Sequence, residues 1–287
     1  MKIAVIADAH GNHHGLEVVL YDIEMEKPDL IISAGDMINP FPDSRKVWYT
    51  LKNANIPMIL GNNEDFIIKY HSEEPNDLIK KSARFKPVQY AAKLFSSTEV
   101  SEMRSLPLSR IIDGPNGDDV LICHASPHDV WKSISDEMDE TMESDLMKIK
   151  ANVIVAAHYH FRWNSIWRGK MLILSGSCGF PMTGKQEVEY LILEHINGKW
   201  GFRHKGIPYD HQSAIRYIAE SDFVREAGPM GWLYMADFIF LQTHIMTFFA
   251  NFYSMRESDS YDELERLIIT YLRHAGIYET VKSILKQ

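Results

Sequence analysis

The chain has 287 residues, of which 45% are hydrophobic and 24% charged, a composition that indicates a globular protein and excludes a disordered, collagen-like or coiled-coil chain. Lys and Arg number 30 against 39 Asp and Glu, so the formal net charge is −9. This balance argues against a general binder of long nucleic acids or of membrane surfaces. It does not exclude a small phosphorylated substrate, because bound cations reverse the local charge.

The sequence features that indicate location point to the cytoplasm. Two cysteines, Cys123 and Cys178, are too few for a disulfide framework. The apolar run at Ile3–Ala7 is too short for a signal peptide. The most apolar segment, Trp232–Ala250, contains Asp237 and does not predict a membrane span. We therefore expect a cytoplasmic protein without a membrane partner.

The first part of the chain alternates short apolar runs with helical patterns. The runs predict buried strands at Ile3–Ala7, Leu30–Ala34, Pro57–Leu60, Val120–Cys123, Val153–Ala157, Met171–Leu174 and Tyr190–Leu193. Apolar periodicity predicts helices at Gly15–Glu26 and Ser44–Ala54. The early alternation implies parallel crossovers, and the closer spacing of the later strands predicts hairpins. We expect residues 1–210 to form one layered domain.

The pattern becomes helical after about Asp210. Helices are predicted at Ile215–Ala219, Trp232–Met255 and Tyr261–Leu285, with a break at Gly228-Pro229. The middle helix is apolar on nearly all sides, so it must be covered by core or by another subunit. Residues 211–287 are thus expected to form a helical extension that packs on the first domain or lies at a homo-oligomer interface.

Side chains that can bind metal follow five of the predicted strands. In chain order they lie in Asp8-Ala9-His10, Gly35-Asp36, Gly61-Asn62-Asn63-Glu64, His124 and His158-Tyr159-His160. Residues two apart on an extended segment point the same way, so each Asp-x-His or His-x-His pair can face one ion. Glycine at 35 and 61 lets the backbone turn close to such a site. Nitrogen and oxygen ligands without cysteine suit Mn, Fe, Zn, Co or Ni.

This ordered set resembles the calcineurin-like metallophosphoesterase superfamily, whose motifs run D-x-H, G-D, G-N-x-[DE], a lone His and H-x-H. The resemblance covers residues 1–210, and the segments ADAHGNHHGLEVVL and CHASPHDVW are similar to a bacterial phosphodiesterase-like branch. The chain length, the GNNED block and the helical tail resemble a streptococcal branch that hydrolyses dinucleoside polyphosphates. The resemblance implies an α+β fold, a four-layer αββα sandwich with a helical C-terminal extension.

The resemblance also implies a dinuclear centre that hydrolyses phosphoesters. The cofactors would be two divalent transition-metal ions, Mn in preference to Fe, Zn, Co or Ni, and a hydroxide between them would attack phosphorus. The implied ligands are Asp8, His10 and His160 for the first ion and Asn62, His124 and His158 for the second, with Asp36 bridging. Asp36, Asn63 and His124 are expected to act in catalysis, and Asn12, Asn63 and Arg162 to contact substrate.

One departure from the family pattern bears on the substrate. Asn63 stands where the family has a histidine interpreted as a general acid or phosphate contact, and an amide cannot donate a proton catalytically. Good leaving groups need no such acid, so phosphodiesters or nucleoside polyphosphates, including dinucleoside polyphosphates, are favoured over alkyl phosphomonoesters. Two smaller departures are Ala157 in place of a glycine and Leu174–Ser177 in place of N-P-G-S, which predicts a turn near the site.

Several alternatives stay open at this point. The chain could be a phosphomonoesterase or protein phosphatase of the same family, or a non-catalytic metal-binding scaffold, although no expected ligand is replaced. Asn12 is as well suited to cap a helix as to contact phosphate, and a solvated Arg162 is favoured over a substrate contact. Glu64 is expected to cap a helix or to orient ligands. The stretch Lys69–Glu102 and the tail could border the cleft if the substrate is large.

Overall fold

The computed structural model describes residues 1–74, 76–135, 137–258 and 260–285, so residues 259, 286 and 287 of the expected extension lie outside it. Its strands form two sheets, with the orders β2-β1-β8-β9 and β3-β4-β5-β7-β6. The strands are β1 (Lys2–Ile6), β2 (Leu30–Ser33), β3 (Ser109–Ile112), β4 (Val120–Cys123), β5 (Val153–Ala156), β6 (Arg162–Trp167), β7 (Lys170–Ser175), β8 (Glu187–Ile196) and β9 (Lys199–Pro208).

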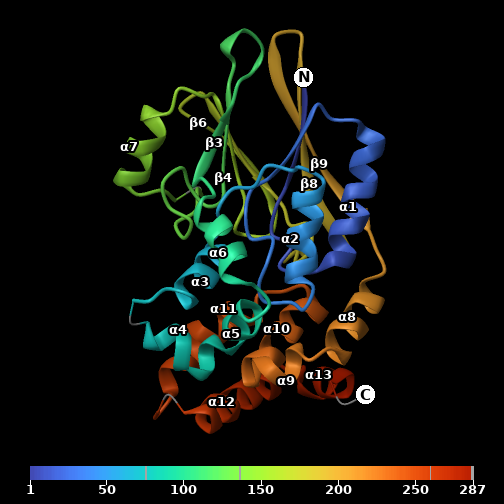
Figure 1. Cartoon of the computed structure of the whole chain (residues 1–287), viewed down its shortest axis with the longest axis vertical. Helices are drawn as coiled ribbons and strands as arrows, with labels where there is room; N and C mark the ends of the chain where they lie inside the picture. The colour runs from blue at the N-terminus through green and yellow to red at the C-terminus, as the bar shows by residue number, and fades with distance from the viewer. Residues whose placement is uncertain (75, 136, 259, 286–287) are drawn as a thin grey trace.

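The two sheets face each other across one apolar core. Val5 of β1 and Leu191 of β8 belong to the same buried cluster as Ile122 of β4 and Val155 of β5. Helices α1 (His13–Glu26) and α2 (Ser44–Asn53) cover the outer face of the first sheet, and α7 (Glu140–Lys148) covers that of the second. The layers therefore run helix, sheet, sheet, helix, as expected, and Figure 1 shows them side by side.

Pairing within the sheets agrees with the expected connections. β1 pairs with β2 in parallel across α1, and β4, β5 and β7 are parallel neighbours. The later strands form antiparallel hairpins, β6 with β7 and β8 with β9. Parallel strands send their carboxyl ends to the same edge of a sheet, which places the segments after β1, β2, β4 and β5 together.

Two details of the strand prediction are wrong. Among the described residues, Pro57–Leu60 makes only one bridge, between Met58 and Ser33, because Pro57 has no N–H and the Leu60 N–H donates to Pro107. In addition, β3, β6 and β9 are strands that the apolar runs do not predict. All three lie at sheet edges, where one side is open to solvent and a continuous apolar run is not required.

Helices connect the sheets and fill the chain after β9. Between β2 and β4 in the chain, after α2, lie α3 (Asn62–Tyr70), α4 (Asp77–Lys81), η1 (Ala83–Phe85), α5 (Lys86–Ala92), α6 (Ser97–Arg104) and, after β3, η2 (Pro115–Gly117). After β9 come α8 (His211–Glu220), α9 (Phe223–Ala227), α10 (Pro229–Phe240), α11 (His244–Asn251), η3 (Tyr253–Met255), α12 (Tyr261–His274) and α13 (Tyr278–Leu285). The secondary structure thus changes type where the boundary at 210 was placed; the division into two domains itself stays a prediction.

The expected middle helix is in fact two. Trp232–Met255 breaks after α10 at Leu241, whose φ is 53°, and the buried carboxylate of Asp237 accepts the backbone N–H of Ile245 across the break. The last expected helix likewise divides into α12 and α13 at Gly276, whose φ is 72°. The predicted break at Gly228-Pro229 is present, with Pro229 opening α10. Shorter helices let the tail fold back on itself.

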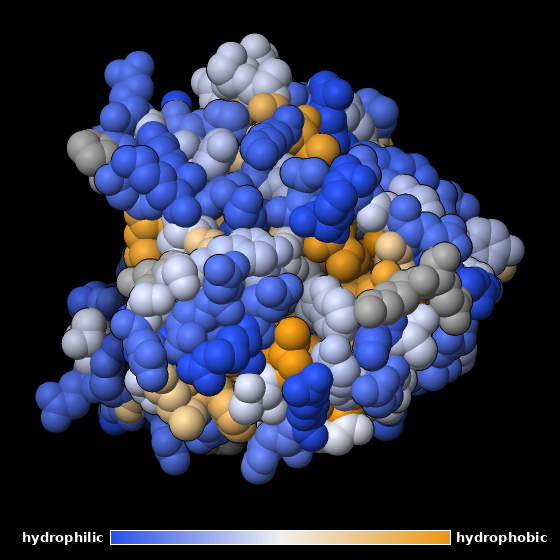
Figure 2. Space-filling view, turned by 90° about the horizontal axis from the view of Figure 1, so that it is seen from below, coloured by the Kyte–Doolittle hydropathy of each residue, from blue (hydrophilic) through white to orange (hydrophobic). Residues whose placement is uncertain are grey.

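The C-terminal helices lie at one end of the sandwich, opposite the hairpin tips (Figure 1). They bury their own core, and α9 and α10 also pack against the first part of the chain, where Phe223 and Phe238 contact Phe41. Seen from this end, the surface is largely hydrophilic with separate apolar patches (Figure 2). Among the described residues, no helix has both the length and the apolar character needed to cross a membrane.

Candidate metal centre

The predicted ligands meet at the end of the sandwich that faces the C-terminal helices. Each follows a strand or opens a helix: Asp8 and His10 follow β1, Asp36 follows β2, Asn62 opens α3, His124 follows β4, and His158 and His160 follow β5. All seven are brought together in two groups that share Asp36. Segments from distant parts of the chain therefore supply one polar cluster.

The backbone that presents these ligands is not extended. This differs from the expectation for the Asp-x-His and His-x-His pairs, Asp8 with His10 and His158 with His160. Asp8, His10, Asp36, His158 and His160 have φ values of 56°, 52°, 54°, 75° and 60°, in the left-handed region that non-glycine residues rarely adopt. Each such residue costs roughly 1–3 kcal/mol, and such strain gathers at functional sites. The paired side chains converge because the chain turns at each of them.

The first ligand group consists of Asp8, His10, Asp36 and His160. The Nε2 atoms of His10 and His160 lie 3.0 Å apart, and His10 Nε2 lies 3.7 Å from Oδ2 of Asp36. His160 Nε2 lies 3.8 Å from Oδ1 of Asp8. Two imidazoles and two carboxylates therefore direct their metal-binding atoms at one point.

The second group consists of Asp36, Asn62, His124 and His158. The side-chain oxygen of Asn62 lies 2.9 Å from both His124 Nε2 and His158 Nδ1. His124 Nε2 also lies 3.4 Å from Oδ2 of Asp36, the oxygen that faces His10 in the first group. One carboxylate oxygen of Asp36 thus contacts both groups.

Backbone carbonyls fix the orientation of three of the imidazoles. The Nδ1 atoms of His10, His124 and His160 lie 2.7, 2.9 and 2.8 Å from the carbonyl oxygens of Asn39, Ala34 and Phe180. Such a contact holds the Nδ1–H tautomer and leaves Nε2 with a free lone pair for a metal. His158 differs, because its Nδ1 faces the centre.

Glu64 holds the loop that carries Asp36. Its buried carboxylate accepts the backbone N–H groups of Asp36, Met37 and Gly61 at 2.9, 2.9 and 3.0 Å. Because Gly61 is the N-cap residue of α3, the bond from its N–H also caps this helix, so Glu64 both caps α3 and holds the backbone of a candidate ligand. A Cβ at Gly61 would collide with the Asp36 carboxylate, which is why glycine is needed there.

Burial controls the protonation of the centre. It lowers the pKa of His10 and His160 and brings that of His158 to about 4, so these imidazoles are neutral at pH 7. Neutral imidazole is the form that binds a metal ion. Burial also lowers the pKa of His124, but the Asp36 carboxylate outweighs burial and raises it to about 9, so this imidazole must release a proton when it binds a metal ion. Burial opposes ionisation of Asp36, but the pairing with His124 outweighs burial and holds the pKa of Asp36 below its ordinary value.

The donor set fits divalent transition metals. Oδ1 of Asp8 is fully buried yet receives no hydrogen bond from any residue that the structure describes, and burial raises the pKa of this carboxyl. A buried carboxylate oxygen without a partner is costly unless a cation balances it. Together with imidazole nitrogens, carboxylates and an amide oxygen, it matches the ligands that Mn, Fe, Co, Ni or Zn accept.

Asn63 lies in the site but contacts protein groups. Its backbone N–H donates to Oδ1 of Asp36 at 2.7 Å, and its amide NH2 donates to Oδ2 of the same carboxylate. Its amide oxygen accepts from the Asn39 side chain at 2.6 Å. These contacts favour a role in positioning Asp36 over the expected contact with substrate.

The other two expected substrate contacts are engaged elsewhere. The Asn12 side chain caps α1 by accepting from the Gly15 N–H at 3.2 Å, and donates to the Gly179 carbonyl at 2.8 Å. Arg162 pairs with Glu187 and Glu189, with both distances at 2.7 Å. The helix cap expected of Asn12 is present, and the substrate contacts expected of Asn12 and Arg162 stay predictions.

Two residues that the sequence analysis did not single out also support the site. The Phe180 ring packs against His10 and His160, with ring centroids 5.5 and 5.6 Å apart, and against Phe238 of α10 at 6.0 Å. The hydroxyl of Ser177 donates to the Asp8 carbonyl at 2.7 Å. Ser177 is the last residue of the expected turn Leu174–Ser177, whose Gly176 has φ of 80°, and Phe180 follows that turn. An aromatic residue in a loop carries no signal that would have identified Phe180.

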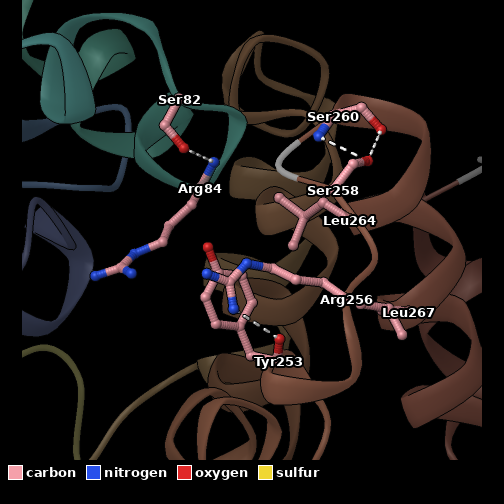
Figure 3. A pocket seen from close by; sticks show the side chains of 8 residues that line it. All are labelled: Ser82, Arg84, Tyr253, Arg256, Ser258, Ser260, Leu264 and Leu267. Atoms are coloured by element: carbon pink, nitrogen blue, oxygen red, sulfur yellow. Dashed lines mark hydrogen bonds between the residues drawn. The ribbon is translucent and has the colours of Figure 1, made fainter.

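A separate pocket lies between η1 and the C-terminal helices. Figure 3 shows Ser82 and Arg84 on one side of it and Tyr253 and Arg256 on the other, with the Arg256 guanidinium over the Tyr253 ring at 4.3 Å. The residues that line it, within the described part of the chain, include none of the candidate ligands. This pocket is therefore distinct from the metal centre.

Comparison with known proteins places these observations in a family. The model of the calcineurin-like phosphoesterase family matches residues 1–175. An uncharacterised protein of Methanocaldococcus jannaschii is 23% identical over 237 residues, which cover 76% of this chain and 92% of that protein. The match to the family model spans the segments that carry all seven ligands.

Two solved structures are similar in fold. A metallophosphoesterase from Sphaerobacter thermophilus matches with a TM-score of 0.64 and 21% identity, covering 84% of this chain and 100% of that one. A hypothetical protein from Pyrococcus horikoshii matches with a TM-score of 0.64 and 19% identity, covering 76% and 92% of the two chains. At these identities the likeness concerns the fold.

Proposed function

The chain belongs to the calcineurin-like phosphoesterase family, and from this premise we propose that it hydrolyses phosphodiesters or nucleoside polyphosphates with good leaving groups at a pair of divalent transition-metal ions. The activity that the name of this family gives is the hydrolysis of phosphoesters. Our proposal goes beyond family membership in three respects: the class of phosphoester, the two-ion mechanism and the preference for Mn.

The shared carboxylate of Asp36 is the observation that carries the proposal. One of its oxygens lies 3.7 Å from His10 Nε2 and 3.4 Å from His124 Nε2, so a single residue borders both ligand groups. When bound, a pair of divalent ions lowers the pKa of water and neutralises charge on phosphoryl oxygens. Asp8, His10 and His160 would hold one ion, and Asn62, His124 and His158 the other, with Asp36 common to both.

The chain's own residues preorganise this centre. Carbonyl groups fix three of the imidazoles, Glu64 fixes the backbone of the Asp36 loop, and Asn63 fixes the Asp36 carboxylate. A rigid arrangement lowers the reorganisation that the transition state would otherwise require. Hydrolysis would then depend on positioned charges more than on a moving side chain.

The preference for good leaving groups follows from Asn63. Its side-chain amide donates to Asp36 and accepts from Asn39, and an amide cannot act as a general acid at neutral pH. A phenolate or a phosphate departs without protonation, whereas an alkoxide does not. We therefore favour aryl diesters and polyphosphates over alkyl phosphomonoesters as substrates.

The test uses metal-stripped protein resupplied with Mn. Hydrolysis of bis-p-nitrophenyl phosphate, p-nitrophenyl phosphate and diadenosine tetraphosphate is measured side by side. We expect cleavage of the diester or the polyphosphate that requires metal, with little monoesterase activity. Dominant monoesterase activity would contradict the substrate class. The absence of turnover with any of Mn, Fe, Co, Ni or Zn bound would favour the scaffold alternative.

A further inference from the structure

The metal centre opens to solvent on one side. Asp8, Asp36 and His124 have exposed fractions of 0, 1 and 0%, so they close the inner side of the site. His158 and His160 are the ligands that retain partial exposure among those described. The segment that carries these two histidines is therefore the part of the centre from which an approaching substrate can reach the ligands.

Two exposed aromatic rings lie on that segment. Tyr159 stands between the two histidines and Phe161 follows them, and their exposed fractions are 40% and 39%. The two rings are stacked, with planes 5° apart and centroids 5.7 Å apart. The Tyr159 ring also lies 5.7 Å from the ring of His158, so the stack begins beside a candidate ligand.

These rings do not contribute to the packing of the core. Neither belongs to the apolar clusters of the described residues, and neither is among the partly buried side chains packed against those clusters. Exposed apolar surface beside a polar site is typical of a binding surface. Two parallel rings offer a flat face that suits another planar group.

We propose that Tyr159 and Phe161 form an aromatic ledge that stacks against a planar aromatic group of the phosphoester substrate, such as a nucleobase, while the phosphate lies at the metal centre. This inference rests on the proposed function and narrows its substrate class to aryl or nucleoside esters. Stacking tolerates any base, because every base has a π face. The ledge therefore predicts a preference for aromatic esters without selectivity for one base.

Two diesters with the same leaving group isolate the contribution of the ledge. They are the p-nitrophenyl ester of thymidine 5′-phosphate and methyl p-nitrophenyl phosphate, both of which release p-nitrophenolate. The quantity measured is the ratio of their kcat/KM values. In the double variant Tyr159→Ala/Phe161→Ala we expect this ratio to fall about tenfold, the usual effect of removing a stacking side chain.

Matched variants separate ring stacking from other effects. Tyr159→Phe and Phe161→Tyr keep planar rings and should keep the wild-type ratio. Tyr21→Ala removes a tyrosine that is 70% exposed on α1 and should also leave the ratio unchanged. Metal content, measured by inductively coupled plasma mass spectrometry, should equal that of wild type in every variant, which separates loss of the ledge from damage to the centre.

A binding measurement makes the test independent of turnover. Adenosine carries no phosphate, so its contact with the protein by saturation-transfer NMR reports on the aromatic surface and not on the metal centre. We expect contact in wild type and its loss in the double variant. An unchanged kcat/KM ratio, or adenosine contact that persists in the double variant, would overturn the ledge while leaving the proposed function standing. If wild type hydrolyses neither ester, the proposed function fails, and the adenosine result alone decides the ledge.

Discussion

Asp36 is the residue on which the two-ion proposal depends most directly. Its Oδ2 borders both ligand groups, so the change Asp36→Asn removes a charge that both ions would share. We expect kcat/KM to fall by more than about 100-fold, since even outer contacts of a metal site are worth roughly 10–100-fold. The metal content should fall from two ions per chain to one or none.

Asp113→Asn is the control for that change, because Asp113 is exposed and lies outside the site. It should keep wild-type activity and metal content. Wild-type turnover in Asp36→Asn would contradict the shared role of this carboxylate.

Asn63 gives a second prediction at the scale of single residues. In Asn63→His an imidazole can donate a proton to a poor leaving group, and general acid catalysis is worth about 10²–10⁴-fold. We expect kcat/KM for an alkyl leaving group to rise by about tenfold relative to that for p-nitrophenolate. The measurement is the dependence of rate on leaving-group pKa.

Asn63→Ala is the companion variant. It removes the hydrogen bonds to Asp36 and Asn39 without adding an acid. It should slow all substrates by a similar factor. If the rates of Asn63→His and Asn63→Ala depend on leaving-group pKa in the same way, the missing general acid does not explain why asparagine stands at position 63.

At the scale of elements, the capping box of α6 also links that helix to α2. Glu99 accepts from Ser96 at the start of α6 and from Arg45 of α2 at 2.8 Å. Burial alone would raise the pKa of Glu99, but these hydrogen bonds outweigh it and bring the pKa to about 2. The carboxylate is therefore stabilised in the folded state.

Glu99→Gln keeps the cap hydrogen bonds, because glutamine also completes a capping box, but removes the charge that pairs with Arg45, so it should lower the free energy of unfolding by about 0.5–1 kcal/mol at neutral pH. Because the folded pKa lies below the unfolded one, this stabilisation is present above the ordinary glutamate pKa and is lost as pH falls toward about 2. Urea unfolding at about pH 7 and about pH 3.5 should thus show a smaller difference between variant and wild type at the lower pH. If the difference in free energy of unfolding between variant and wild type does not change with pH, the stabilisation does not come from the ionised Glu99 carboxylate.

At the scale of the whole molecule, the C-terminal helices complete the wall of the metal centre. Phe238 of α10 is fully buried and packs against Phe41 and against Phe180, which contacts His10 and His160. The sandwich and the tail therefore stabilise each other. Removal of residues 211–287 would expose this surface, so we expect the shortened chain to aggregate and not to act as an isolated domain.

A single substitution tests this packing without removing the tail. Phe238→Ala should lower the free energy of unfolding by about 3–5 kcal/mol, because it leaves a cavity in the core. Met246→Ala in α11, where the side chain is 68% exposed, should change it by less than about 0.5 kcal/mol. Urea denaturation of both variants compares them. Equal stabilities would mean that the tail and the sandwich are not coupled through Phe238.

The sequence by itself determined which candidate ligands come together and most of the central strands. The expected strand Val120–Cys123 coincides with β4, because a strand covered on both faces must be apolar throughout. The order of Asp, Asn and His at successive strand ends sufficed to predict which residues meet, since parallel strands end at one edge. The edge strand β6, with exposed and half-buried residues alternating, carries no such run and was not predicted.

Only the tertiary structure decided how each polar group is used. The protein partners of Asn12, Asn63 and Arg162 lie far away in the chain and include Gly179, Asp36 and Glu189, so residue type alone does not predict them. The contacts of these side chains with substrate stay predictions. The stacking of Tyr159 on Phe161 likewise depends on left-handed turns at the histidines beside them. Residue type and spacing fix what a side chain can do, whereas long-range packing fixes what it contacts.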